Sequence, residues 1–252
     1  MSKIPKFVFF GQGDVAKAAL LAMRKFNLIP SIEGEFGIVA SYGKIIPKSV
    51  IDSFKYGLLN IHPSMLPLLR GPSPIKSAIL ENLEETGVSI MLLDEQLDHG
   101  PILIQEEIAL SPRMATNDEL RNALMDKGGE LLVRVIPDWI SGKLTPTPQD
   151  HSLATYTKKF KADEGLIPFS LLRCPTPKLP EYARDFVIAE HKVRALNPEP
   201  GTFSIIPTIR GNKHVKILKA HIEQDRFVPD IVQPAGKRPM SWSAFLHGHK
   251  IT

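Results

Sequence analysis

Residues 57–71 read Gly-Leu-Leu-Asn-Ile-His-Pro-Ser-Met-Leu-Pro-Leu-Leu-Arg-Gly, and this stretch decides the fold of the first half of the chain. Its first part, 57–62, predicts a strand that ends at a proline-rich turn. Side chains two positions apart in a strand point the same way, so Asn60 and His62 are expected on one face. The strand therefore delivers an amide and an imidazole together to its carboxyl end.

The surrounding sequence predicts that strands and helices alternate. Apolar or alternating runs predict strands at 6–11, 36–41, 86–93 and 102–110. Helical spacing predicts a helix after the first strand and further helices at 47–51, 74–80 and 116–140. This alternation is typical of an open α/β sheet, in which ligands bind at the carboxyl ends of the strands.

After Gly142 the composition changes, because prolines become frequent, as linkers often show. Short runs at 201–206, 215–220 and 231–232, separated by glycine turns, predict a small β-barrel or sheet. We therefore expect a first domain over residues 1–145, a linker over 146–182 and a second domain over 183–252.

The side chains of Asn60, His62 and Asp98 have the chemistry needed to add an amine to a carbonyl. They offer a donor for the developing oxyanion, a proton acceptor, and an anion that orients the imidazole. Each residue alone is ordinary, since Asn, Asp and Gly are common in turns. The combination of Asn60-x-His62 with Asp98-x-Gly100 is far more specific. His62 fits two roles here, a base or a charged hydrogen-bond donor.

Composition limits the class of protein. Of the 252 residues 43% are hydrophobic, and no apolar run reaches the length of a bilayer span. The single cysteine, Cys174, excludes an internal disulfide and a cysteine-cluster metal site, and it has no obvious base beside it. We expect no metal, no signal peptide, no membrane partner and a reducing, cytoplasmic setting.

Charge is spread unevenly along the chain. Residues 1–150 carry 15 Lys and Arg against 18 Asp and Glu, whereas residues 151–252 carry 16 against 9. The balances of −3 and +7 reproduce the net charge of +4. A basic second half suggests a polyanion as partner. The alternative is an ordinary soluble domain with excess lysines and no nucleic-acid ligand.

The pattern Asn60-x-His62-x-Ser64-x-Leu66-Pro67-x-x-Arg70-Gly71, followed by Asp98-x-Gly100, resembles the catalytic signature of 10-formyltetrahydrofolate-dependent formyltransferases. The chain is identified as a member of that family, which implies 10-formyltetrahydrofolate as formyl donor. The resemblance also implies that Asn60, His62 and Asp98 are catalytic. Residues 41–47 are similar to the segment that contacts the folate pterin. The implied folate contacts are Ser41, Tyr42, Gly43, Ile45, Leu93, Asp94 and Asp98.

Three further stretches, 154–159, 194–201 and 233–241, are similar to motifs of the branch of the family that formylates an aminoacyl-tRNA. This implies a shortened, Rossmann-like open-sheet domain followed by a small OB-like β-barrel domain that helps to hold tRNA. The implied partner is initiator methionyl-tRNA, and no protein partner is implied. Arg70 and Gly71 would either fix their turn or face a substrate phosphate. The implied substrate contacts are Ser64, Leu66, Pro67, Arg70, Gly71, Lys158 and Lys159.

The chain departs from the family between Phe26 and Phe36. The family normally carries a further strand, a basic loop, a helix and a third strand there. Only residues 27–35 stand here, too few for one βαβ unit of about 30 residues. The sheet should be narrower, and the loop that enters the tRNA acceptor end in the family is absent. Two alternatives stay open: formylation of a sugar-nucleotide amine, and a non-catalytic folate- or RNA-binding relative.

Overall fold

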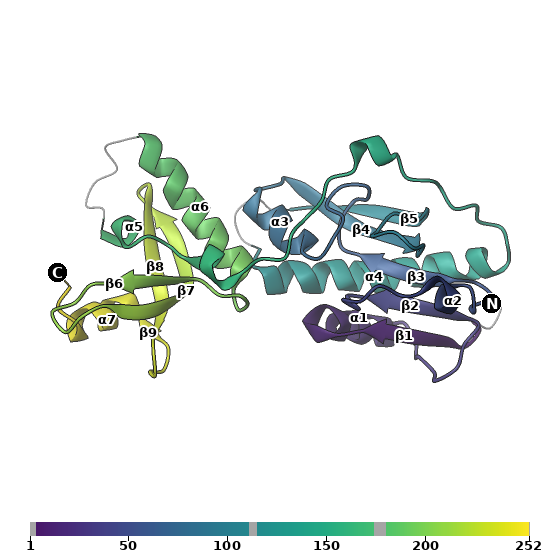
Figure 1. Cartoon of the computed structure of the whole chain (residues 1–252), viewed down its shortest axis with the longest axis horizontal. Helices are drawn as coiled ribbons and strands as arrows, with labels where there is room; N and C mark the ends of the chain where they lie inside the picture. Colours follow the sequence, from purple (N-terminus) through teal and green to yellow (C-terminus); the bar gives the residue numbers. More distant parts are fainter. Residues whose placement is uncertain (1–3, 111–114, 174–179, 252) are drawn as a thin grey trace. The chain divides into compact units, whose positions relative to one another are not determined.

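A computed structural model describes residues 4–110, 115–173 and 180–251. The chain divides into two compact units, and each has its own sheet (Figure 1). Unit 1 comprises Met1–Ala78 and Leu83–Lys159, and unit 2 comprises Ile79–Asn82 and Phe160–Thr252. Cys174, for which the sequence indicates no role, lies outside the described residues.

Unit 1 is built on a five-stranded sheet whose spatial order follows the chain. The first three strands run parallel, whereas the fourth and fifth are each antiparallel to the preceding strand. The sheet is therefore mixed, a detail that the alternation of elements does not predict. Its strands are β1 (Phe7–Gly11), β2 (Phe36–Ala40), β3 (Leu58–His62), β4 (Glu85–Leu92) and β5 (Ile102–Ala109).

The helices of unit 1 lie where helical spacing predicts them. The longest begins after Thr116, whose hydroxyl accepts from the Glu119 backbone N–H while the Glu119 carboxylate accepts from the Thr116 backbone N–H. This reciprocal cap satisfies two donors that the first turn leaves free. The helices are α1 (Gly13–Lys25), α2 (Lys48–Ile51), α3 (Pro74–Leu80) and α4 (Asn117–Ile140).

Two adjacent glycines let α4 approach its neighbours closely. A Cβ at Gly128 would stand 2.7 Å from Cγ2 of Ile61, which is a β3 residue. A Cβ at Gly129 would stand 3.2 Å from Ala22 of α1. Ile61 therefore faces α4, and because strand side chains alternate, Asn60 and His62 face the opposite side of the sheet.

The sheet ends at β1, as expected from the short connection between Phe26 and Phe36. The connecting residues return to the start of β1, where the Ser31 backbone N–H donates to the Phe7 carbonyl at 2.8 Å. Among these residues Ile29 is 69% exposed and Ile32 is 96% exposed. The connection that the sequence predicts to be too short for further strands is thus a loop with two apolar side chains on its surface.

Unit 2 contains a four-stranded antiparallel sheet with a core of its own and, within the described residues, three α-helices and one short 3-10 helix, η2. The expected fold class, an open α/β domain followed by a small β domain, is confirmed, although the described residues contain no closed barrel. The helix at 180–196 was not predicted, because prolines around it indicated a linker. The elements are η2 (Ala162–Gly165), α5 (Phe169–Arg173), α6 (Pro180–Leu196), β6 (Phe203–Ile206), β7 (Lys213–Glu223), β8 (Arg226–Pro234), β9 (Met240–Ser241) and α7 (Trp242–Gly248).

One buried histidine in unit 2 is a titratable group in a mostly apolar setting. His191 of α6 is 8% exposed. Burial lowers the pKa of His191, and the charge of Arg194 lowers it further. Glu190 and a hydrogen bond with the Leu80 backbone act in the opposite direction. The net effect favours the neutral imidazole in the folded state.

Across the described part of the chain, no helix is long and apolar enough to cross a membrane.

Candidate active site

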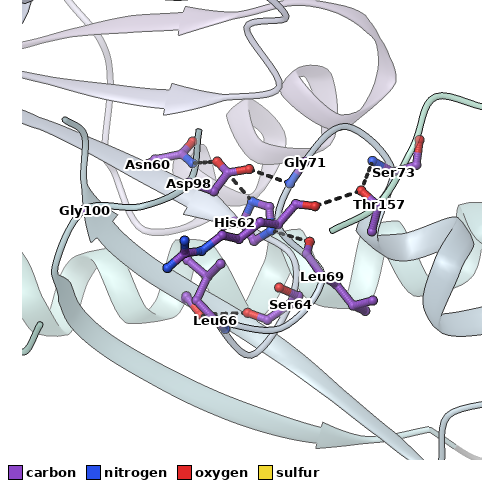
Figure 2. Close-up of polar contacts among 12 residues, drawn as sticks. Asn60, His62, Ser64, Leu66, Leu69, Gly71, Ser73, Asp98, Gly100 and Thr157 are labelled. Carbon is purple, nitrogen blue, oxygen red and sulfur yellow. Dashed lines mark hydrogen bonds and ion pairs between the residues drawn. The ribbon is translucent and has the colours of Figure 1, made fainter. Parts of the chain in front are cut away.

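The structure brings Asn60, His62 and Asp98 into contact, as Figure 2 shows. Asn60 and His62 lie at the end of β3, and Asp98 comes from the connection between β4 and β5. Oδ1 of Asp98 lies 3.4 Å from the Asn60 amide nitrogen, which donates to it, and 3.6 Å from Nδ1 of His62. One carboxylate oxygen therefore serves both neighbours. All three residues are buried, with at most 9% of their surface exposed.

Backbone groups complete the surroundings of the trio. The Gly71 N–H donates to Oδ2 of Asp98 at 2.7 Å, and Nε2 of His62 lies 3.1 Å from the Leu69 carbonyl oxygen. Each ring nitrogen of His62 thus faces an oxygen, so a hydrogen on either nitrogen has an acceptor. Asp98 itself has φ of 48°, a left-handed conformation that an Asp tolerates better than most residues.

The turn after β3 is fixed by polar groups from β4 and β5. Ser89 donates to the Ser64 carbonyl and accepts from the Leu66 backbone N–H. Gln105 donates to the Leu66 carbonyl at 2.7 Å, and the Ser64 hydroxyl donates to the Leu68 carbonyl at 2.6 Å. Ser64 and Leu66, with Pro67 after them, therefore shape this turn beneath His62, and their side chains are largely buried.

Arg70 is turned into the protein, since it is only 1% exposed. Its guanidinium donates to Oε1 of Gln149 from Nε at 3.2 Å and from Nη2 at 2.6 Å. Nη2 also lies 2.8 Å from Nδ1 of His151, and Nη1 lies 3.4 Å from the Tyr156 hydroxyl. Among the residues that the structure describes, no carboxylate forms an ion pair with Arg70. Of its two expected roles, these contacts favour fixing the turn.

A segment more than eighty residues further along the chain binds the same turn. The Thr155 hydroxyl accepts from the Leu69 N–H at 2.8 Å, and the Thr157 hydroxyl accepts from the Ser73 N–H at 3.0 Å (Figure 2 shows Thr157 beside Ser73). Backbone bonds also join Arg70 to both threonines. Gln149, Thr155 and Thr157 were not predicted as site residues. The two threonines lie in the 154–159 stretch that resembles a family motif, whereas nothing local in the sequence signals the contacts of Gln149. Lys158 and Lys159, which follow them, are exposed.

The expected folate contacts come from two segments of unit 1. Tyr42 lies edge-on to Phe10 at 5.8 Å, and Leu93 packs on the same apolar cluster. Ser41 and Gly43 have φ of 51° and 73°, and Ile45 is 87% exposed. Leu93 and Asp94 line a hollow of about 350 Å³ beside α2. Its other lining residues are Lys48, Ile51, Asp52, Glu95 and Gln96.

Asp94 is held in place by neighbouring polar groups. Its Oδ2 lies 2.6 Å from Nδ1 of His99, and its Oδ1 accepts from the Gln96 N–H. The His99 ring stacks on the His151 ring with centroids 3.9 Å apart. Within the described residues, no group of three or more His, Cys, Asp or Glu side chains is placed to hold a metal ion.

Known proteins are similar to this chain in sequence and in fold. Residues 1–136 match the family described as formyl transferase. Methionyl-tRNA formyltransferase of Chloroflexus aurantiacus is 36% identical over 245 residues, which cover 87% of this chain and 73% of that protein. HypX from Aquifex aeolicus, solved in complex with tetrahydrofolic acid, has a similar fold, with a TM-score of 0.72 at 15% identity over 97% of this chain and 47% of HypX. This chain thus spans about half the length of HypX.

Methionyl-tRNA formyltransferase from Clostridium thermocellum is also similar in fold, with a TM-score of 0.60 at 18% identity. The alignment covers 91% of this chain and 98% of that protein. At this identity the likeness concerns the fold alone, and it extends over both units of the chain.

Proposed function

Because this chain belongs to the formyl transferase family, we propose that it moves a formyl group from 10-formyltetrahydrofolate to the α-amine of methionine carried by initiator tRNA. The observation that carries the proposal is the position of Asp98 Oδ1 between the Asn60 amide and the His62 ring. A hydrogen-bond donor, an imidazole and a buried carboxylate contact one another at the carboxyl end of β3.

In the reaction, the methionine nitrogen forms a bond to the formyl carbon, and the bond between that carbon and N10 of the folate breaks. The electron pair of the broken bond goes to N10, which gains a proton, while the amine loses one. The Asn60 N–H and the His62 ring stabilise the oxyanion that develops on the formyl oxygen. A preorganised donor of this kind contributes roughly 3–4 kcal/mol.

His62 also assists the proton movement, since histidine is the side chain that most often serves as general acid or base in enzymes. Asp98 orients the ring through Nδ1 and stabilises a positive charge on it. A base requires the neutral ring, and a charged donor requires the protonated ring. Turnover that rises with pH supports the first role, and turnover that falls with pH supports the second.

The chemistry of the residues proposed to contact the folate suits such a substrate. Tyr42 and Leu93 offer apolar surface, and Asp94 offers a carboxylate whose partners already fix its orientation. An aromatic and aliphatic surface with a few fixed polar groups is typical of sites for ring-shaped ligands. We assign Ser41, Tyr42, Gly43, Ile45, Leu93, Asp94 and Asp98 to folate binding on this basis together with the family resemblance.

The acceptor assignment rests on the curated relatives and on charge. The methionyl-tRNA formyltransferase of Chloroflexus aurantiacus aligns with most of this chain. Residues 151–252 carry 16 Lys and Arg against 9 Asp and Glu, which suits a polyanionic partner. We therefore assign tRNA binding to the second domain, proposed at 183–252, and to Lys158 and Lys159 in the linker that precedes it. We also propose a cytoplasmic setting, because the proposed acceptor is an aminoacylated tRNA.

Formyl transfer to three acceptors tests this proposal: methionyl initiator tRNA, methionyl elongator tRNA and an amino-sugar nucleotide, each with 10-formyltetrahydrofolate. We expect formylmethionyl-tRNA as the product. Formylation of the sugar nucleotide alone would replace tRNA with a sugar-nucleotide acceptor. Binding of folate or RNA with no transfer to any acceptor would identify a non-catalytic relative.

A further inference from the structure

We propose that Gln149 is a positioning residue that fixes the backbone of Asp98, and through it the geometry of the catalytic trio. This inference deepens the proposed function and rests on it for its kinetic consequences. Gln149 is 6% exposed and follows the last strand of unit 1 by forty residues. No sequence motif in the resemblance to the family includes it.

All hydrogen-bonding groups of the Gln149 side chain are used. Its Nε2 donates to the Asp98 carbonyl at 3.0 Å and to the Gly100 carbonyl at 2.7 Å. Its Oε1 accepts from two nitrogens of Arg70. The amide can adopt only this orientation, because a guanidinium offers donors alone and carbonyls offer acceptors alone. A flipped amide would place donor against donor and acceptor against acceptor.

The two carbonyls that Gln149 binds bracket the tightest part of the Asp98 connection. Asp98 has φ of 48°, and a Cβ at Gly100 would stand 2.0 Å from the Leu92 carbonyl oxygen. This close approach leaves the loop little freedom at Gly100. Two hydrogen bonds from one rigid amide fix the Asp98–His99 and Gly100–Pro101 peptide groups. The direction of the Asp98 side chain therefore follows from contacts made by Gln149.

Arg70 in turn fixes Gln149. The buried guanidinium has no carboxylate partner among the described residues, so the Gln149 oxygen is its principal acceptor. Backbone bonds with Thr155 and Thr157 hold Arg70 itself. The Gln149 amide thus joins the turn after β3 to the loop that carries Asp98. Its oxygen serves Arg70, and its nitrogen serves Asp98.

Gln149→Glu separates the contacts of the side-chain oxygen with Arg70 from those of the side-chain nitrogen with the Asp98 loop. A carboxylate still accepts from Arg70, and does so as an ion pair, but it cannot donate to the Asp98 and Gly100 carbonyls. Gln149→Leu removes both sets of contacts. Ser152→Ala is the matched control in the same segment, because within the described part of the chain the exposed Ser152 side chain bonds only to Asp150. The measurements are kcat and KM for both substrates, the thermal midpoint, and hydrogen exchange of the Gly71 amide.

We expect Gln149→Glu to keep the fold and both KM values, and to lower kcat by about 10- to 100-fold, as a small displacement of a catalytic group does. Gly71 exchange should quicken by at least about 10-fold, because its N–H donates to Oδ2 of Asp98. Gln149→Leu should match that loss of kcat and also melt earlier. Ser152→Ala should change none of these quantities.

Three results would overturn the proposal. One is a Gln149→Glu enzyme with wild-type kcat and wild-type Gly71 exchange, which would assign Gln149 only to the stabilisation of Arg70. Another is a rise in KM with kcat unchanged. The third is unfolding of both variants, because the ion pair with Arg70 should preserve the fold. If the wild type formylates no acceptor, the proposed function fails, and Gly71 exchange in the two variants still decides the role of Gln149.

Discussion

Replacing Asp98 by Asn tests whether its charge or its shape serves the site. The carboxylate accepts from the Asn60 amide on Oδ1 and from the Gly71 backbone N–H on Oδ2. An Asn at this position can accept on only one side, because its other atom is a donor. We expect the remaining oxygen to face Gly71, whose contact of 2.7 Å is much shorter than those of 3.4 and 3.6 Å to Asn60 and His62.

The expected cost in stability is small for Asn and larger for Ala. A hydrogen bond to a charged group contributes about 1.5–3 kcal/mol and a neutral one about 0.5–1.5, so Asp98→Asn should lower the free energy of unfolding by about 1 kcal/mol. Asp98→Ala leaves the buried Gly71 N–H without an acceptor and should cost about 2–3 kcal/mol. Both variants lose the anion beside His62, so each should lower kcat by about 100-fold or more, or about 2.7 kcal/mol.

Urea unfolding and steady-state formylation measure the two effects separately. Asp126→Asn is a suitable control, since Asp126 makes an exposed ion pair with Lys25 and should cost little. His62→Ala should lose turnover to a similar extent, and adding Asp98→Asn to it should lower kcat little further, because the two residues act as a unit. Near wild-type kcat in Asp98→Asn would refute the role of the anion, and additive losses in the double variant would refute their partnership.

Other predictions concern the rest of the molecule. Burial lowers the pKa of His191, so the unfolded chain binds a proton more readily than the folded chain. The free energy of unfolding should therefore fall as the pH drops below about 6.5. In His191→Gln the difference in this free energy between about pH 7.5 and 5.5 should be smaller than in the wild type. Binding of tRNA should weaken steeply with salt, and replacing the exposed Lys216 by Gln should reduce the slope of log K against log salt by roughly one if it meets a phosphate. Because the connection between Phe26 and Phe36 is short, we expect a weak preference for initiator over elongator tRNA and a low catalytic efficiency on the initiator. Grafting a segment of family length there should raise the preference and the efficiency. A strong initiator preference without the graft would contradict this.

Local sequence signals predicted the elements that carry the site. The helix at Pro74–Leu80 has the bounds expected from its sequence, and the spacing of Asn60 and His62 placed both on one face of a strand. The approach of Asp98 to them came from the family resemblance, because the distance between 62 and 98 has no local signal. The folded chain adds the atoms that meet, such as the shared Oδ1 of Asp98.

Other features depend on contacts that a single sequence does not reveal. The antiparallel direction of β4 and β5 leaves the alternation of side chains unchanged, so the pattern is the same for either direction. Helix α6 is stabilised by packing in the core of unit 2; it begins at the end of the proline-rich stretch that indicated a linker and continues into the predicted second domain. Gln149 and Arg70 meet across seventy-nine positions, and neither residue type signals its partner.

Because Gly128 has no side chain, the position of the catalytic side chains depends on packing at the opposite face of the sheet. Ile61 stands between Asn60 and His62 in the chain, and its side chain occupies the room that a Cβ at Gly128 would need. A glycine inside a helix costs about 1 kcal/mol of helix propensity, so α4 gives up some intrinsic stability for this close approach. The height of the strand above the helix sets how far Asn60 and His62 reach toward a substrate. A substitution at Gly128 would therefore change the position of the catalytic side chains from the opposite face of the sheet.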